Sequence, residues 1–359
     1  MSGTPLIEVV TPATAAAGRD GQGRWVYLGK SVTLRRRVEA VRARPREPLG
    51  RGLQVIAREL RQPFLDFVAD IGAAEPDAVS WWSTTFSWKV WGASDLFLLV
   101  CYLKAAQELI DEALDHGADL TLVVEDDWLA HQIADANAPR GVRCRRRPLA
   151  AAKIGAFVLG TARRLAWLGQ TLGSWRRQRR FTGRAAAVPR ATAAIYTYPM
   201  TRCLRDAGGY ADALLPGMDD LLRECGHRVM FFSPPERGGF EAELAARRQY
   251  FRPLILDSSA GAVIRSLFAM WRPRVRTWPL IAGLRVDHLA CREYWRDAAR
   301  AQWCRYRHFY ECARKMLTDE ALEWVVFPFE NQPWEKLLVL AARERGVRTA
   351  GVQHSTLAT

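Results

Sequence analysis

Short, continuously apolar runs recur along the chain and alternate with segments of helical periodicity. Runs of this kind predict strands of a parallel sheet that is covered on both faces. Helical patterns separate several of them, for example at 96–116, 210–225 and 334–345. Alternating strands and helices are typical of a doubly wound α/β domain. The expected strands are 24–29, 78–83, 120–126, 193–199, 228–234, 252–257, 323–329 and 349–354.

The stretch 138–190 interrupts this alternation. It opens with RGVRCRRRP, closes with SWRRQRRFTGR, and carries 14 Lys or Arg and no acidic residue. We therefore expect a basic amphipathic helical insertion, which either lies on an anionic membrane surface or packs on the domain as a helical hairpin with a solvated basic face. The side chains that share one helical face are Ile154, Phe157, Val158, Thr161, Leu165, Leu168, Leu172 and Trp175.

The net charge of +14 first suggests a nucleic-acid partner, but its distribution argues against one. Residues 136–205 carry 16 Lys or Arg and no acid, whereas the rest of the chain has 36 basic and 38 acidic residues. The sequence also lacks the motifs of the common nucleic-acid-binding folds. It has no uncharged apolar stretch of about 18 residues, so we expect no membrane-spanning helix. The seven cysteines are scattered without metal-binding spacing, which is typical of reduced cytosolic thiols.

The organisation of the chain follows from these patterns. Residues 1–20 lack the basic and apolar regions of a signal peptide, so we expect a mobile lead-in there. We expect 21–137 to be the first part of one α/β domain and 191–359 to be its remainder, with the basic insertion at 138–190 between them.

Polar residues follow the last two apolar runs, at the point where each predicted strand ends. Glu330 and Asn331 follow WVVFPF, and Gln353, His354 and Ser355 follow TAGV. Two strands joined by one helix are expected to be parallel neighbours about 4.8 Å apart. Both polar clusters then lie at the carboxyl edge of the sheet, where open α/β sheets bind ligands.

The chemistry of these side chains suits catalysis or substrate binding. Glu330 can act as a base or hold a substrate hydroxyl, and His354 can act as an acid or base or pair with a phosphate. Pro333 suits the first turn of the intervening helix, whose N-terminus attracts anions. In the alternative interpretation Asn331 only caps this helix, Glu335 is only a first-turn charge, and His354 is only a turn residue.

Other predicted strand ends carry weaker candidates. The acidic residues 125–127 follow a strand and could hold a divalent metal with a nucleotide diphosphate. Acidic residues also begin helices, and the helix pattern WLAHQIADA follows, so we favour a helix cap and expect no metal site. Polar candidates for substrate binding at the remaining strand ends are Ser83, Thr84, Lys89 and Tyr198.

The segment 327–356, FPFENQPWEKLLVLAARERGVRTAGVQHST, resembles a motif of bacterial capsule and lipopolysaccharide glycosyltransferases. These proteins have the GT-B architecture of two Rossmann domains and include Kdo-transferase-like members. In them a strand ends in Glu–Asn, Trp–Glu opens the next helix, and the following strand ends in Gln–His–Gly. This chain departs from the motif at Ser355, where Gly is usual. The tracts 80–97 and 195–222 are also similar to these proteins.

The resemblance implies a Rossmann-like parallel sheet and transfer of a sugar from a nucleotide-activated donor to a glycan or lipid-linked acceptor. It places the enzyme at the cytoplasmic face of the inner membrane, with the nucleotide sugar as substrate and no cofactor. It assigns Glu330 and His354 to catalysis, and Asn331, Glu335, Gln353 and Ser355 to substrate binding.

In this family a second Rossmann domain of about 150 residues follows the matched motif. We therefore expect the chain to be the N-terminal half of a GT-B protein, truncated at its C-terminus and inactive alone. Three alternatives stay open. They are a teichoic-acid-type polyol-phosphate transferase, a metal-dependent GT-A enzyme that uses 125–127, and a non-catalytic, membrane-docked assembly protein.

Overall fold

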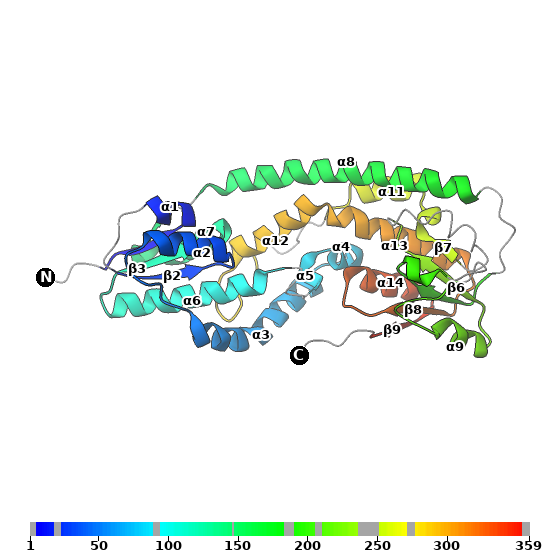
Figure 1. Ribbon diagram of the computed structural model, residues 1–359, viewed down its shortest axis with the longest axis horizontal. Coiled ribbons are helices and arrows are strands. Elements are labelled where there is room, and N and C mark those ends of the chain that lie inside the picture. The colour runs from blue at the N-terminus through cyan, green and yellow to red at the C-terminus, as the bar shows by residue number, and fades with distance from the viewer. Residues whose placement is uncertain are drawn as a thin grey trace. The chain divides into compact units, whose positions relative to one another are not determined.

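The chain forms two compact units, and each unit has its own parallel sheet (Figure 1). Unit 1 comprises Met1–Pro76, Lys89–Phe157 and Pro273–Arg296, and unit 2 comprises Asp77–Trp88, Val158–Arg272 and Asp297–Thr359. The α/β class with parallel strands is confirmed, although the strands divide between two sheets instead of one. The computed structural model describes residues 5–17, 23–88, 94–145, 147–182, 190–204, 210–235, 251–270 and 277–353.

The sheet of unit 1 has the strand order β2-β3-β1-β4. Its strands are β1 (Ile7–Val10), β2 (Arg24–Leu28), β3 (Leu120–Val124) and β4 (Arg143–Arg145). Side chains of α1 (Pro12–Ala17) and α2 (Val32–Val41) pack on one face of this sheet. The helices α6 (Leu96–Asp115) and α7 (Asp127–Asn137) also contact its strands, and α3 (Gly50–Ala73) packs on α6.

The expectation of a mobile lead-in over 1–20 is wrong for the residues that form β1 and α1. The run IEVV forms β1, which pairs with β3 on one side and with β4 on the other. Ile7, Val9 and Val10 are almost fully buried, so this short apolar run supplies an inner strand of the sheet. The signal was present in the sequence as three large aliphatic side chains within four residues.

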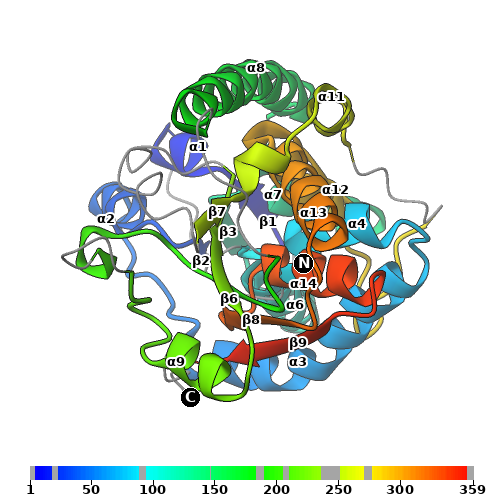
Figure 2. The same ribbon diagram turned by 90° about the vertical axis from the view of Figure 1, so that its right-hand side faces the viewer.

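The sheet of unit 2 has the strand order β7-β6-β5-β8-β9, and all neighbouring strands are parallel. One face packs on α13 (Gln302–Asp319) and α14 (Pro333–Arg343), whereas α9 (Met218–Glu224) packs on the other (Figure 2). The strands are β5 (Ala193–Tyr196), β6 (Val229–Ser233), β7 (Phe251–Pro253), β8 (Trp324–Pro328) and β9 (Arg348–Val352).

Three predicted elements differ from the structure. The expected strand 78–83 is helical instead, as α4 (Ala78–Trp82) and α5 (Thr85–Trp88), because Asp77 caps α4 by accepting the N–H groups of Val79 and Ser80. The predicted helix 210–225 contains only α9, and the predicted strand 252–257 divides into β7 and the 3-10 helix η4 (Leu254–Asp257). The other predicted strands are confirmed, with ends that differ by up to three residues.

The basic insertion contains a single continuous helix, α8 (Leu149–Thr182), instead of a helical hairpin (Figure 1). Its residues from Val158 onward belong to unit 2, together with α11 (Ala260–Leu267) and the end of α12 (Asp287–Arg300). In the part of the chain that the structure describes, no helix combines the length and apolarity needed to cross a membrane.

Candidate functional site

The order of strands in the sheet of unit 2 reverses between β5 and β8. From β5 the chain adds β6 and β7 on one side, and it then returns to add β8 and β9 on the other side. In open parallel sheets such a switch point leaves a crevice beyond the carboxyl ends of the two central strands, where ligands bind. We name this region, with residues 197–198 after β5 and 329–336 after β8, the β5–β8 edge.

The prediction that β8 and β9 are neighbouring strands is confirmed. The two strands are parallel, with Phe327 opposite Gly351 and Pro328 opposite Val352. The ladder continues past β8, because the Phe329 N–H donates to the Val352 carbonyl at 2.8 Å. Gln353, which directly follows β9, therefore lies near the start of the loop that carries Glu330.

Asn331 holds the backbone of this loop. It adopts the left-handed region, with φ of 59°, which asparagine tolerates better than most residues. The Lys336 ammonium donates to Asn331 Oδ1 at 2.7 Å and to its carbonyl at 3.0 Å, and Asn331 Nδ2 donates to the Trp88 carbonyl at 3.4 Å. Asn331 is thus a structural residue in this conformation, while the neighbouring Glu330 is exposed.

Glu335 is buried in the first turn of α14 and closes the loop from within. Its Oε1 accepts the backbone N–H of Glu330 at 2.8 Å, and its side chain is 1% exposed. Its Oε2 is buried without a hydrogen-bond partner among the described residues. Burial raises the pKa of this carboxyl, against the lowering effect of the backbone N–H groups of Glu330 and Gln332. Glu335 is therefore more than a solvated first-turn charge.

Aromatic side chains pack beside the loop that joins β8 to α14. Trp334 stacks on Tyr196, with centroids 4.0 Å apart and planes at 17°. Tyr198, which follows β5 and is partly exposed, meets Trp334 edge-on at 6.1 Å. The Lys336 ammonium stands 5.7 Å from the ring centroid of Trp82. The structure thus brings Tyr198, Trp82 and the β8–α14 loop together within unit 2.

Thr197 anchors the end of β5 through buried polar contacts. Its hydroxyl lies 2.6 Å from the Tyr210 hydroxyl and donates to the Asp212 carboxylate, which also accepts the N–H groups of Leu214 and Leu215. Burial raises the pKa of Tyr210. These contacts fix the conformation of the backbone that precedes Tyr198. No sequence pattern indicated this network or the role of Lys336, because no periodicity marks a contact between loops.

Like Asn331, two further predicted substrate-binding residues have structural roles instead. Ser83 and Thr84 are buried, and their hydroxyls donate to the carbonyls of Val79 and Trp81 at 2.7 Å and 2.8 Å. Their misplacement follows from the strand that was expected at 78–83, since a helical turn directs them into the core. Lys89, His354 and Ser355 lie outside the described residues.

The acidic run after β3 serves the fold of unit 1. Glu125 Oε2 accepts the Tyr27 hydroxyl and the N–H groups of Lys30 and Ser31, at 2.7–3.0 Å. Asp126 caps α7 through Oδ1 and accepts Arg292 Nε through Oδ2 at 2.6 Å. The helix-cap interpretation of Asp126 is confirmed. Within the described ranges, no three His, Cys, Asp or Glu side chains gather in a metal-binding arrangement.

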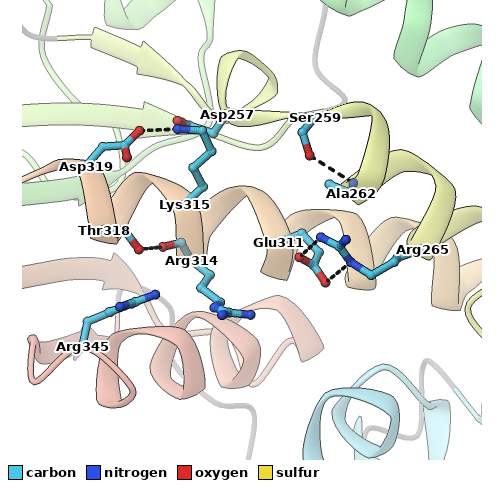
Figure 3. A pocket seen from close by; sticks show the side chains of 10 residues that line it. All are labelled: Asp257, Ser259, Ala262, Arg265, Glu311, Arg314, Lys315, Thr318, Asp319 and Arg345. Carbon is cyan, nitrogen blue, oxygen red and sulfur yellow. Dashed lines mark hydrogen bonds and ion pairs between the residues drawn. The ribbon is translucent and has the colours of Figure 1, made fainter.

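The described part of unit 2 also contains polar hollows outside the β5–β8 edge, and two of them differ in their lining. One, of about 270 Å³, lies between α11 and α13, and its cations already face carboxylates, as in the pairs Arg265–Glu311 and Lys315–Asp319 (Figure 3). The other, of about 390 Å³, has no acidic residue in its lining, which consists of Arg163, Ala166, Trp167, Gln170, Arg300, Gln302 and Arg305.

The β5–β8 edge therefore combines an exposed carboxylate, a buried carboxyl of raised pKa, a positioned ammonium and aromatic surface. This set can accept a proton from a hydroxyl and present apolar ring faces to a substrate. Comparison of the chain with protein families, curated proteins and solved structures finds no match.

Proposed function

We propose that the chain is the core of a glycosyltransferase that moves a sugar from a nucleotide-activated donor to a glycan or lipid-linked hydroxyl. The observation that carries the proposal is the exposed Glu330 at the topological switch point of a parallel sheet. The resemblance of 327–356 to surface-polysaccharide glycosyltransferases also supports it, because the motif lies at the same strand end.

The proposed step is a displacement at the anomeric carbon. The acceptor oxygen forms a bond to that carbon, and the bond from the carbon to the donor phosphate breaks, so the nucleotide leaves with the electron pair. The acceptor proton passes to the Glu330 carboxylate, which is exposed and so accessible to an acceptor. His354 stays a predicted second acid or base, since it lies outside the described residues.

The surrounding residues keep Glu330 in place. Glu335 holds the Glu330 backbone, and Lys336 holds that of Asn331. Tyr198 and Trp82 offer ring faces on which a sugar or a nucleobase can stack. Positioning of this kind supplies much of the rate in two-substrate reactions, because the entropy of bringing the reactants together has been lost on binding.

The experiment compares Glu330→Gln with Glu323→Gln. Glu323 is an exposed carboxylate just before β8, at the opposite end of the same strand, so it is a matched control. Donor binding is titrated with UDP-, CMP- and CDP-activated sugars, and turnover is measured as nucleotide release by the purified protein. We expect Glu330→Gln to keep donor affinity and to lose about 10²–10⁴-fold in turnover, while Glu323→Gln keeps both.

Three outcomes would contradict the proposal. The first is that no activated sugar binds. The second is that both variants turn over at the wild-type rate. The third is consumption of a CDP-linked polyol in place of a sugar, which would favour the polyol-phosphate transferase.

A further inference from the structure

One side of α8 is apolar and exposed to solvent. Counted at 3.6 residues per turn, the side chains between 154 and 172 that share this face form a stripe about 27 Å long. We name it the α8 stripe. Its large members are between 40% and 65% exposed, and they are Ile154, Phe157, Val158, Leu165 and Leu172.

The side of α8 that packs on unit 2 is polar by comparison. Thr171, Ser174 and Gln178 are buried there beside Trp167. The hydroxyls of Thr171 and Ser174 have no hydrogen-bond partner among the described residues. Close packing is achieved at Gly160, where an added Cβ would stand 2.3 Å from the Ala298 carbonyl oxygen.

Further contacts fix the rotation of α8 about its own axis. The Arg163 guanidinium donates to the Ala299 carbonyl and that of Arg164 to the Leu267 carbonyl, both at 3.0 Å. The Trp167 ring meets the buried His308 edge-on at 5.5 Å. Arg163, Arg164, Trp167 and Gly160 of α8 all lie on the packed side or its flank, so the α8 stripe is left facing outward.

This polarity is the reverse of that expected for a helix on a water-soluble surface. Burying one large aliphatic or aromatic side chain is worth about 1.5–3 kcal/mol, and burying an unpaired hydroxyl costs free energy. Soluble proteins rarely expose a contiguous apolar patch unless it binds something. The α8 stripe therefore calls for an apolar partner.

The charge of α8 identifies that partner. The helix carries seven Lys or Arg and no acidic residue, and four of these, Arg176, Arg177, Arg179 and Arg180, lie close together in its last turns. Each basic residue near an anionic leaflet contributes about 1 kcal/mol of attraction. Two copies of α8 facing each other would instead bring like charges together, which argues against self-association through this face.

We propose that α8 lies flat in the interface of an anionic lipid bilayer, with the α8 stripe at the boundary of the acyl chains and the arginines at the headgroups. The membrane contact is a property of the surface of α8. It holds whatever reaction takes place at the β5–β8 edge, so it can be tested without a substrate.

The test measures co-flotation of the full chain with vesicles of phosphatidylcholine, with or without phosphatidylglycerol. We expect binding to the anionic vesicles only, and release at 1 M salt, where the Debye length falls to about 3 Å. Leu165→Glu should lower the partition coefficient at least about tenfold, because a carboxylate enters the apolar stripe. Leu165→Gln should lower it by less, since it removes apolar area without adding charge.

Gln170→Glu is the matched control. It adds the same charge about 140° further round the helix, in the arginine-lined hollow, where a carboxylate is accommodated. We expect its partition coefficient to stay within about threefold of wild type, and circular dichroism should show all variants folded. Equal binding to neutral and anionic vesicles, no binding, or equal loss in Leu165→Glu and Gln170→Glu would overturn the proposal. So would a lipid-free dimer that Leu165→Glu converts to a monomer.

Discussion

Glu335 Oε1 accepts the backbone N–H of Glu330 at 2.8 Å, so a buried carboxyl holds the loop that presents an exposed one. The two groups differ in environment although they are five residues apart. Glu330 is exposed to solvent, whereas Glu335 is buried in the first turn of α14 against the core. Environments that differ in this way allow neighbouring carboxyl groups to take different roles.

The first prediction concerns the pH dependence of stability at Glu335. Because burial raises its pKa above the ordinary value of 4.5, the folded state favours the protonated form. Its stabilising contribution is present below pH 4.5 and is lost as the pH rises through the folded-state pKa. Gln is nearly isosteric and cannot titrate, so Glu335→Gln should gain in free energy of unfolding relative to wild type as the pH rises.

Urea unfolding between pH 4.5 and 8 checks this expectation. Glu323→Gln replaces an exposed carboxylate in the same unit and controls for the loss of one negative charge. A stability difference between Glu335→Gln and wild type that stays constant with pH would show that Glu335 is charged in the folded state.

The second prediction concerns Arg292 in unit 1. Its guanidinium contacts Asp95 at 2.8 Å, Asp126 at 2.6 Å and Glu293 at 2.7 Å, and its side chain is 12% exposed. Arg292→Met would remove the cation that contacts all three carboxylates, while Arg296 would still contact Asp95 and Glu293 at 2.6 Å and 2.9 Å. We therefore expect a loss of about 3 kcal/mol in the free energy of unfolding, at the lower end for a broken buried ion pair. Arg292→Lys should recover only part of it, because a point charge cannot reach all three partners.

Denaturant unfolding measures both variants. Arg285→Lys and Arg285→Met provide the control, since Arg285 is 76% exposed and pairs with Asp287 at 3.3 Å. Exposed pairs contribute about 0–1 kcal/mol, so these changes should be small. A loss of less than about 1 kcal/mol in Arg292→Met would mean that the cluster is solvated in solution.

The local patterns of the sequence predicted those parts of the fold that local physics decides. β8, α14 and β9 were predicted because two apolar runs flank a helix that begins with Pro333. The strand expected at 78–83 failed because its run of aromatic and aliphatic residues suits a buried helix equally well, and the cap Asp77 decides for the helix.

The contacts that build the site are not local, and for that reason the sequence did not reveal them. Asp297 accepts the N–H and the hydroxyl of Thr85 at 2.9 Å and 2.8 Å across 212 positions of the chain. Thr197 and Asp212 meet across a loop without periodicity. The order of strands in the sheet also follows from long-range pairing, and it is this order that places Tyr198 beside Trp334.

The third prediction concerns His308, which is fully buried in α13 with its Nε2 2.8 Å from the Ser258 hydroxyl. Burial lowers the pKa of His308 from 6.5 to about 4. The neutral imidazole therefore stabilises the fold above pH 6.5, and this contribution is lost as the pH falls toward 4. Between pH 7 and pH 5 the advantage of wild type over His308→Gln should shrink by about 2 kcal/mol.

Urea unfolding at the two pH values gives this difference directly. His116→Gln replaces an exposed imidazole in unit 1 and controls for the loss of one histidine. If the advantage of wild type over His308→Gln were the same at pH 7 and pH 5, the imidazole would be open to protonation in the folded protein.

The fourth prediction compares two glycines of α8. Alanine is favoured over glycine within a helix by about 1 kcal/mol, so both Gly160→Ala and Gly169→Ala would stabilise an isolated helix. In the folded chain their surroundings differ. A Cβ at Gly160 would stand 2.3 Å from the Ala298 carbonyl oxygen, whereas a Cβ at Gly169 meets nothing within 4 Å.

We therefore expect opposite signs in thermal and urea unfolding. Gly169→Ala should raise the free energy of unfolding by about 0.5–1 kcal/mol. Gly160→Ala should lower the free energy of unfolding by about 1–3 kcal/mol. The new Cβ would meet the Ala298 backbone, which cannot move aside as a flexible side chain would, so α8 would have to shift away from α12. Stabilisation by both substitutions would mean that α8 is not seated at Gly160 in solution, and the outward direction of the α8 stripe would then lose its structural basis.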